Sequence, residues 1–218
     1  NKINQLDIPL IEDCAQALGT KINNQYVGTF GDISVFSFYA SKLITTAQGG
    51  MLVSKNKNYI EKAKDYLNFD YRKEYYPRFN FQMTDIQAAM GIVQLNKLDS
   101  FLENRRLIAK EYKEICKKIG LDYQKPISDN RTHNFYRFVI KGQEEYINKL
   151  KMKFEEAGIE TIIPIKKWEL LHNYLNIQSK KFHVAEKISK STLSLPIFPE
   201  ILQNKMLEEI KPILLKGV

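Results

Sequence analysis

The longest regular pattern in this chain is an apolar stripe at helical spacing that begins after Thr84 and ends at Gly120. Its members are Ile86, Ala89, Val93, Leu98, Leu102, Ile108, Tyr112 and Ile115. Thr84 and Gln87 have the spacing of a capping box, which marks the first turn of a helix. A glycine such as Gly120 is typical of a helix end. The sequence therefore predicts one long helix over this stretch.

A helix of this length commonly joins two domains, and 218 residues suffice for one large domain or a domain and a half. We therefore place a domain boundary near residue 104. Residues 1–104 then form the first domain and residues 105–218 a second, smaller one. Asp99 and Ser100 mark the site where we expect the helix to bend.

The first domain begins with short apolar runs that are typical of strands. IPLIED (8–13) ends in two acids, as a buried parallel strand does when its carboxyl end carries polar function. YVGTFGDISVFSF (26–38) predicts a strand, a glycine turn and a second strand, and GGMLVS (49–54) predicts the next strand. A helix is expected at about 57–67.

The second domain mixes strand and helix patterns. The strand candidates are HNFYRFVI (133–140) and IETIIPI (159–165). The helix candidates are EEYINKLKMKFEEAG (144–158), HVAEKISKSTLS (183–194) leading into LPIF, and residues 201–214. Helices packed on a small sheet form an α+β module.

The composition is that of an ordinary globular protein, with 44% hydrophobic and 27% charged residues. No apolar run reaches the length of a membrane span, and the first residues lack the apolar core of a signal peptide. Cys14 and Cys116 suggest reduced thiols rather than a disulfide framework. His133, His172 and His183 are widely spaced and form no zinc pattern, so no metal site is expected. We therefore expect a cytoplasmic protein without a membrane partner.

The excess of Lys and Arg gives a formal net charge of +8. Such an excess would suit nucleic acid if it were clustered. It is instead interleaved with Glu, as in ENRRLIAKEYKEICKK, which is typical of solvated helix faces. Nucleic-acid binding is the less favoured interpretation, and an anionic small-molecule substrate would also suit this charge.

Four polar side chains lie within residues 13–42: Asp13, Gln16, Ser37 and Lys42. The last two belong to the stretch SFYASKLITTAQGG (37–50). Pyridoxal phosphate (PLP) needs an amine for its aldehyde, a carboxylate for its ring nitrogen, a donor for its phenolic oxygen, and hydroxyls and amides for its phosphate. The four residues offer these groups at strand ends and turns, where loops carry function. Singly, each has an ordinary interpretation, since an Asp after a strand is commonly a turn residue and a Lys is commonly solvated.

The order and spacing of these residues resemble a known family. The stretch from IEDCAQALG to ITTAQGGMLV is similar to the cofactor-binding region of the DegT/DnrJ/EryC1/StrS aminotransferases, and the similarity continues through RFNFQMTDIQAAMGIVQLNKLDSFLENRR. The resemblance implies a fold-type I PLP-dependent transferase. In that fold the chain would carry the later part of the large α/β domain, followed by a small α+β domain.

The resemblance also implies a role for individual residues. Lys42 would carry the cofactor through its aldehyde and shuttle a proton between substrate and cofactor. Asp13 would pair with the ring nitrogen, Gln16 would face the ring and its phenolic oxygen, and Ser37 would bind the phosphate. Asn80 would reach the cofactor phosphate of a neighbouring subunit, which implies a homodimer with shared sites.

The implied reaction is ping-pong transamination, in which an amino donor, typically glutamate, supplies the amino group for a nucleotide-linked keto sugar in surface polysaccharide or glycoconjugate synthesis. His172 resembles a position near the family's substrate pocket, and a partly buried structural histidine explains it equally well. The family usually has Gly-Glu in place of Ala47 and Gln48, and a basic residue in place of Gln82. These departures leave the identity of the sugar open.

Family chains begin well upstream of the first strand found here, so we expect an N-terminal segment to be missing from this chain. That segment carries a phosphate-binding helix start and an aromatic residue that stacks on the cofactor ring. The alternative to an enzyme is therefore a truncated, non-catalytic family member that serves in dimerisation, regulation or nucleic-acid binding.

Overall fold

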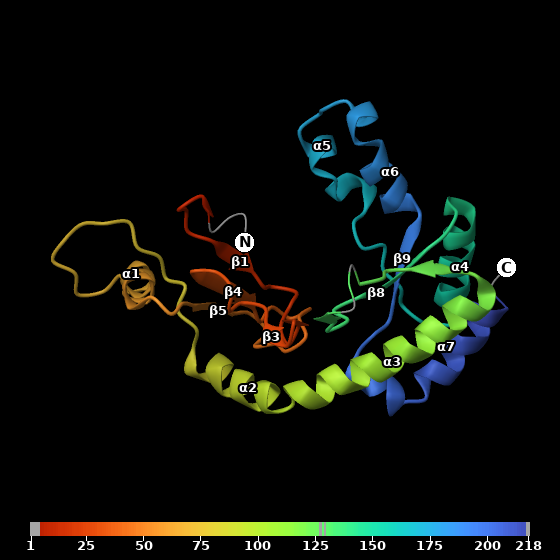
Figure 1. Ribbon diagram of the computed structural model, residues 1–218, viewed down its shortest axis with the longest axis horizontal. Coiled ribbons are helices and arrows are strands. Elements are labelled where there is room, and N and C mark those ends of the chain that lie inside the picture. Colours follow the sequence, from red (N-terminus) through yellow and green to blue (C-terminus); the bar gives the residue numbers. More distant parts are fainter. Residues whose placement is uncertain (1–4, 127, 129, 217–218) are drawn as a thin grey trace. The chain divides into compact units, whose positions relative to one another are not determined.

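The computed structural model describes residues 5–126, 128 and 130–216, and the chain divides into two compact units (Figure 1). Unit 1 comprises residues 1–101 and 128–136, and unit 2 comprises residues 102–127 and 137–218. The chain therefore enters unit 2, returns to unit 1 for a short segment, and leaves it again. The domain boundary expected near residue 104 stays a prediction. It did not include the return of residues 128–136 to unit 1.

The main sheet of unit 1 has three strands in the order β1, β4, β5 (Figure 1). β1 (Ile11–Asp13) pairs in parallel with β4 (Ile33–Ser37), and β4 pairs antiparallel with β5 (Gly50–Val53). The predicted strands are thus present, and the first is parallel as expected. It is not buried, however, because the side chain of Ile11 is 61% exposed.

A second small sheet of unit 1 has the order β3, β2, β7. β2 (Lys21–Ile22) and β3 (Gln25–Tyr26) form a hairpin whose turn residues, Asn23 and Asn24, both have positive φ. Asparagine tolerates this conformation, which two-residue hairpin turns require. β7 (Arg131–Thr132) adds antiparallel to β2 and comes from the returning segment of the chain.

The helices of unit 1 begin at side-chain caps. α1 (Lys57–Leu67) starts after Asn56, whose side chain accepts a hydrogen bond from the N–H of Asn58. α2 (Asp85–Asn96) starts with the capping box predicted for Thr84 and Gln87.

The single long helix expected between Thr84 and Gly120 is wrong, because the structure has two helices there. α2 ends at Asn96, and α3 (Leu98–Ile119) follows after Lys97. The N–H of Lys97 bonds to the carbonyl of Gln94, three residues back, which tightens the last turn and interrupts the α-helical pattern. The interruption therefore precedes the bend expected at Asp99 and Ser100.

Unit 2 contains a three-stranded antiparallel sheet in the order β6, β8, β9. Its strands are β6 (Asp122–Tyr123), β8 (Phe138–Lys141) and β9 (Thr192–Leu195). Two expectations need correction. The strand predicted for 133–140 starts only at Phe138, and 159–165 contributes a single bridge between Ile162 and Ser194.

Unit 2 also contains helical segments that follow this sheet's first strands along the chain. They are α4 (Glu144–Glu156), η2 (Lys167–Glu169), α5 (Leu171–Tyr174), η3 (Ser179–Phe182), α6 (His183–Lys190), η4 (Pro199–Leu202) and α7 (Met206–Leu215). The helix predicted for 183–194 stops at Lys190, since the residues from Thr192 belong to β9. The helix predicted for 201–214 is shortened at its start by η4.

Unit 2 has a dense apolar core. Tyr112 on α3 is fully buried and its ring lies 5.1 Å from that of Phe138 on β8, while its hydroxyl donates to the carbonyl of Pro196 at 2.8 Å. Burial of this phenol raises its pKa, because the ionised form loses solvation. Lys211 on α7 forms an ion pair with Glu111 on α3, so these two helices lie side by side (Figure 1).

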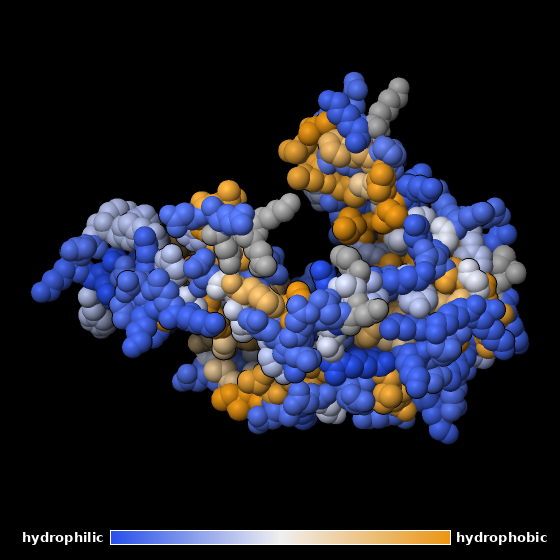
Figure 2. All heavy atoms as spheres, in the orientation of Figure 1, coloured by the Kyte–Doolittle hydropathy of each residue, from blue (hydrophilic) through white to orange (hydrophobic). Residues whose placement is uncertain are grey.

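Unit 1 leaves much apolar surface uncovered. One face of α2 exposes Ile86, Met90 and Val93, and apolar side chains gather over this helix in Figure 2. Met51 and Val53 on β5 are exposed as well. Exposed apolar side chains gathered on one helix face are typical of an interaction surface. Within the described residues, the structure has no helix with the length and apolarity that crossing a membrane requires.

Candidate active site

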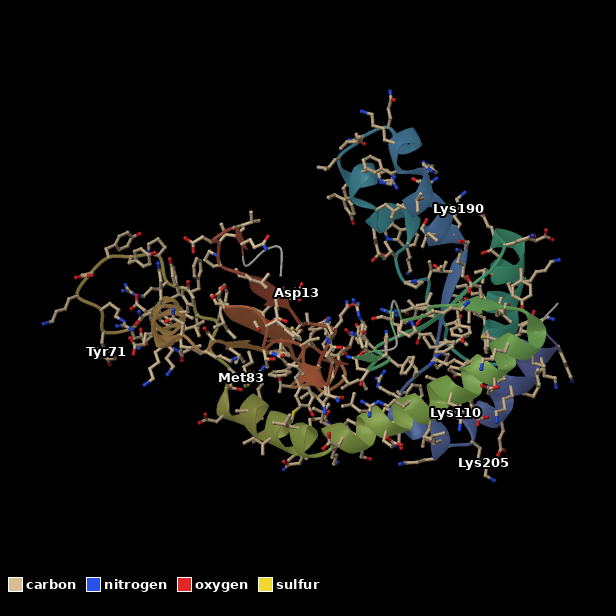
Figure 3. All side chains as sticks on the ribbon, viewed as in Figure 1. Asp13, Tyr71, Met83, Lys110, Lys190 and Lys205 are labelled. Carbon is tan, nitrogen blue, oxygen red and sulfur yellow. The ribbon has the colours of Figure 1, made fainter. Side chains whose placement is uncertain are left out.

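The carboxyl ends of β1 and β4 meet at one edge of the main sheet. Asp13 is the last residue of β1 and pairs with Val35, two residues before Ser37 at the end of β4. The Asp13 carboxylate accepts a hydrogen bond from the backbone N–H of Ala15 at 3.0 Å and is exposed (Figure 3). Parallel strands place their functional groups at this edge. Asp13 and Ser37 therefore lie where the sequence predicted a cofactor site.

Glu12, which the sequence analysis did not single out, fixes the loop beside this edge. Its carboxylate accepts the N–H groups of Gly28 and Phe30, both at 2.8 Å, and of Gly31 at 2.6 Å. Partial burial favours the neutral form of Glu12, but the N–H donors of Gly31, Gly28 and Phe30 outweigh it and hold the pKa below its ordinary value. The ionised carboxylate thus anchors the turn that leads into β4.

Lys42 lies in a closed loop between β4 and β5. Two backbone hydrogen bonds of 2.9 Å close it, from Phe38 N–H to the Gly49 carbonyl and from Thr46 N–H to the Phe38 carbonyl. Within the loop, the N–H of Lys42 bonds to the carbonyl of Tyr39, also at 2.9 Å. The backbone that carries Lys42 is therefore held on both sides.

The side chain of Lys42 is half-buried, and the two residues after it, Leu43 and Ile44, are buried. Its Nζ lies over the ring of Tyr136, 5.2 Å from the ring centroid. Tyr136 belongs to the segment that returns to unit 1. This neighbour was not predicted, because it is remote in the sequence.

Hydrogen bonds from α2 brace the second half of the loop. The N–H of Thr45 donates to Gln94 Oε1 at 3.4 Å, and Gln87 Nε2 donates to the carbonyl of Gln48 at 3.0 Å. The hydroxyl of Thr45 accepts the N–H of Ala47, which has a φ of 64°. The two residues that depart from the family pattern, Ala47 and Gln48, thus lie in a turn stabilised by α2.

Gly49 lies close to two side chains at the end of this loop. A Cβ atom there would lie 2.5 Å from Thr46 Oγ1 and 2.6 Å from Met83 Cε. Thr46 is itself buried and donates to the carbonyl of Gln48 at 2.9 Å. A larger residue at position 49 would force the side chains of Thr46 and Met83 to move.

Ser37 and Gln16 complete the predicted set at this edge. Ser37 Oγ is half-buried and accepts the N–H of Tyr39 at 3.3 Å. Gln16 lies in the turn after β1, with an exposed side chain and a carbonyl that accepts Asn134 Nδ2 at 2.9 Å. The structure therefore brings Asp13, Gln16, Ser37 and Lys42 to the loops at one edge of the sheet.

Asn80 lies in a loop of unit 1, between α1 and α2. Its neighbours Phe79 and Phe81 stack with ring centroids 5.1 Å apart, and Asn80 between them is exposed. Arg78 holds the loop by an ion pair of 3.2 Å with Asp65 of α1. The predicted role of Asn80 toward a neighbouring subunit stays a prediction.

His172 belongs to unit 2, where it lies on α5. Its ring is 5% exposed, its Nε2 is 2.8 Å from Glu186 Oε1, and it stacks on Phe182 at 4.7 Å. The hydrogen bond from His172 lowers the pKa of Glu186, against the opposing effect of burial. These contacts hold α5 and α6 together, and a role in substrate binding stays a prediction.

The donor set at the sheet edge fits PLP. Lys42 supplies an amine, Asp13 an exposed carboxylate, and Ser37 a hydroxyl beside the backbone N–H of Tyr39. These are the groups that bind an aldehyde, a protonated ring nitrogen and a phosphate, respectively.

Comparison with known proteins gives two findings. The family model described as the DegT/DnrJ/EryC1/StrS aminotransferase family matches residues 3–211. A GDP-perosamine synthase from Vibrio cholerae is 32% identical over 209 residues, which cover 91% of this chain and 56% of that protein. The chain spans a little over half the length of the curated relatives it matches.

Solved structures have the same fold. The aminotransferase TlmJ from Streptoalloteichus hindustanus matches with a TM-score of 0.86 and 25% identity, covering 99% of this chain and 60% of that one. The PLP form of a putative sugar aminotransferase from Streptococcus pneumoniae matches with a TM-score of 0.80 and 23% identity, covering 97% of this chain and 59% of that one. The fold is therefore that of PLP-dependent aminotransferases, as predicted.

Proposed function

The chain belongs to the DegT/DnrJ/EryC1/StrS aminotransferase family, and on this premise we propose that it takes part in PLP-dependent transfer of an amino group from glutamate to a nucleotide-linked keto sugar, for the synthesis of surface polysaccharide or another glycoconjugate. One observation carries the proposal: Asp13, Ser37 and Lys42 lie at the same edge of the main sheet, on β1, on β4 and in the loop after β4. The similarity to a GDP-perosamine synthase supports the sugar substrate.

Bound PLP would supply an electron sink for the carbanion formed on the amino acid or the amino sugar. The residues of this chain would hold and orient it. The Asp13 carboxylate would accept a hydrogen bond from the protonated ring nitrogen, and the Ser37 hydroxyl would donate to the phosphate. The exposed side chain of Gln16, in the turn after β1, would lie against the ring and donate to its phenolic oxygen.

Lys42 has two tasks in this proposal. Its amine would hold the cofactor by condensing with the aldehyde, with loss of water, and its Nζ would then hold and return a proton during amino transfer. Both tasks need an amine on a fixed backbone, because a proton transfers only over hydrogen-bond distance. The closure of the loop from Phe38 to Gly49 supports this role.

The proposed assembly is a homodimer in which Asn80 of one subunit reaches the cofactor phosphate of the other. The exposed apolar face of α2 and the exposed aromatic residues around Asn80 support a partner surface on unit 1. We also propose a cytoplasmic location, since Cys14 and Cys116 are free and buried and suit a reducing compartment. Measurement of mass in solution tests the dimer.

The test is covalent labelling of the chain by PLP. The purified protein is mixed with PLP, its visible absorption is recorded, and the adduct is reduced with borohydride and mapped by mass spectrometry. We expect one label per chain at Lys42, and Lys42→Ala should abolish it. Lys62→Ala, which removes an exposed lysine on α1, is the matched control and should label like the wild type. Labelling scattered over surface lysines, or unchanged in Lys42→Ala, would refute the site.

A second measurement tests the reaction. Glutamate added to the PLP-loaded protein should shift its visible absorption as the cofactor takes up the amino group, and an amine-loaded protein should then be discharged by a nucleotide-linked keto sugar. A protein that labels at Lys42 but responds to no amino donor would contradict amino transfer while leaving the binding site intact.

A further inference from the structure

The segment that returns to unit 1 contacts Lys42 through the ring of Tyr136. β7 pairs with β2 through Lys21 and Thr132, and the N–H of Asn23 donates to the carbonyl of Asn130 at 2.9 Å. The amide of Asn130 in turn donates to Asn23 Oδ1 at 2.6 Å. These contacts attach the start of the segment to the hairpin of unit 1.

Asn134 attaches the next part of the segment to the turn after Asp13. It is 3% exposed, and its Nδ2 donates to the carbonyl of Gln16 at 2.9 Å and to that of Leu18 at 3.1 Å. Its Oδ1 accepts the N–H of Tyr136 at 3.1 Å. One buried amide therefore links the turn beside the predicted cofactor site to the backbone of Tyr136.

The backbone between these two residues takes a rare conformation. Phe135 has a φ of 48°, and its N–H donates to His133 Nδ1 at 2.8 Å. Its ring is buried and lies 4.6 Å from the ring of His133. A bulky residue in the left-handed region persists only where its surroundings enforce it, and such outliers cluster at functional sites. Here the surrounding hydrogen bonds hold Phe135, and the next residue is Tyr136.

We infer that Tyr136 is a positioning residue for Lys42. Its ring lies 5.2 Å from Lys42 Nζ, and the face of an aromatic ring attracts an ammonium group. Asn134 and the turn at Phe135 fix the backbone of Tyr136, so the ring is carried from a fixed point beside Lys42 and restricts the directions in which the lysine amine can point. The inference rests on the proposed function in that the restricted amine is the one that would attach the cofactor.

The aromatic ring of Tyr136, and not its hydroxyl group, lies under Lys42 Nζ and would position it. Tyr136→Phe keeps the aromatic face and should behave like the wild type. Tyr136→Leu keeps an apolar side chain of comparable size but removes the aromatic face. It should slow borohydride-trapped labelling of Lys42 by PLP about three- to tenfold. The matched control is Tyr26→Leu, which removes the ring under Lys21, 4.4 Å from its Nζ, and should leave Lys42 labelling unchanged.

A second readout needs no cofactor. The lysines are converted to their ¹³C-dimethyl forms, which stay cationic, and the Lys42 signal is assigned in an NMR spectrum with Lys42→Arg. In the wild type and in Tyr136→Phe this signal should be shifted upfield by the ring, and in Tyr136→Leu it should move to the position of solvated lysines. Far-ultraviolet circular dichroism checks that the variants are folded.

The two readouts separate the inference from the proposed function. A wild-type chain that takes up no PLP at Lys42 contradicts the proposed function, while the NMR signal still decides whether Tyr136 holds the lysine. Tyr136→Leu with an unchanged NMR signal overturns the inference. If the wild type does bind PLP at Lys42, an unchanged rate of labelling in Tyr136→Leu overturns the inference as well.

Discussion

The replacement Glu12→Gln tests how the turn before β4 is held. Glutamine keeps one carbonyl oxygen, which can still accept the N–H groups of Phe30 and Gly31 that bond to Glu12 Oε1. Its amide nitrogen then faces the N–H of Gly28, which loses its acceptor at 2.8 Å. Hydrogen bonds to a charged group contribute about 1.5–3 kcal/mol each and are roughly twice as strong as neutral ones. One bond is lost and two are weakened, so with partial solvent exposure we expect a loss of about 2–3 kcal/mol.

Two assays measure this loss in the free energy of unfolding. In urea, a destabilisation of this size lowers the midpoint of unfolding by roughly 1–2 M, followed by circular dichroism. Hydrogen exchange read by mass spectrometry over residues 26–34 should become faster by roughly 30- to 150-fold where local opening limits exchange. Glu61→Gln, at an exposed position of α1, is the matched control and should change neither.

The pH dependence of stability tests whether the charge of Glu12 is what stabilises the turn. The pKa of Glu12 is lowered in the folded protein from the ordinary value of 4.5. The ionised carboxylate therefore contributes its full stability above the pKa of the unfolded chain, and the contribution is lost as pH falls through the folded pKa. The difference between wild type and Glu12→Gln should be largest near neutral pH and shrink below about 4.5. A difference under about 0.5 kcal/mol at pH 7, or one that does not shrink in acid, would refute the reasoning.

Three further replacements test the scaffold, each by urea unfolding. Thr84→Ala removes the capping box of α2 and should cost about 1 kcal/mol with faster hydrogen exchange in its first turn; unchanged exchange would contradict the cap. Gly28→Ala puts a Cβ 2.6 Å from Phe36 Cζ at a φ of 89° and should cost about 2–4 kcal/mol. Gly120→Ala, with a φ of 69° and no atom within 4 Å of the added Cβ, should cost only about 1–2 kcal/mol. Equal losses at the two glycines would show that the contact with Phe36 is unimportant.

Local patterns predicted most of the regular elements. The alternation at Ile33 and Val35, the run after Gly49 and the cap at Thr84 each depend on neighbours within a few residues, and the strands and helix starts follow. The helix break at Lys97 was missed because the apolar spacing continues through it. The strand expected from residue 133 failed because Asn134 bonds to carbonyls 116 and 118 residues away rather than to a neighbouring strand.

The candidate site was predictable to a similar extent. Strand ends, a glycine-rich turn and the family resemblance were enough to expect Asp13, Ser37 and Lys42 together, and the structure has them at one edge of the sheet. Their roles stay predictions. Glu12 was not given a role, since its partners lie 16 to 19 residues later in a loop with no acceptor pattern of its own. The contact between Tyr136 and Lys42 could not be predicted from the sequence. The two residues are 94 positions apart and meet only because the chain returns to unit 1.

The return of the chain to unit 1 sets an order for folding during synthesis. The amide of Asn134 bonds to a carbonyl 118 residues earlier, so the first unit stays incomplete on the ribosome until that residue has emerged. At about 5–20 residues per second, the delay is roughly 6–24 s. α2 is made only in the later part of this delay, and α3 and β6 are also complete before Asn134 is added. The first unit therefore completes its fold only after the first elements of the second unit have been synthesised.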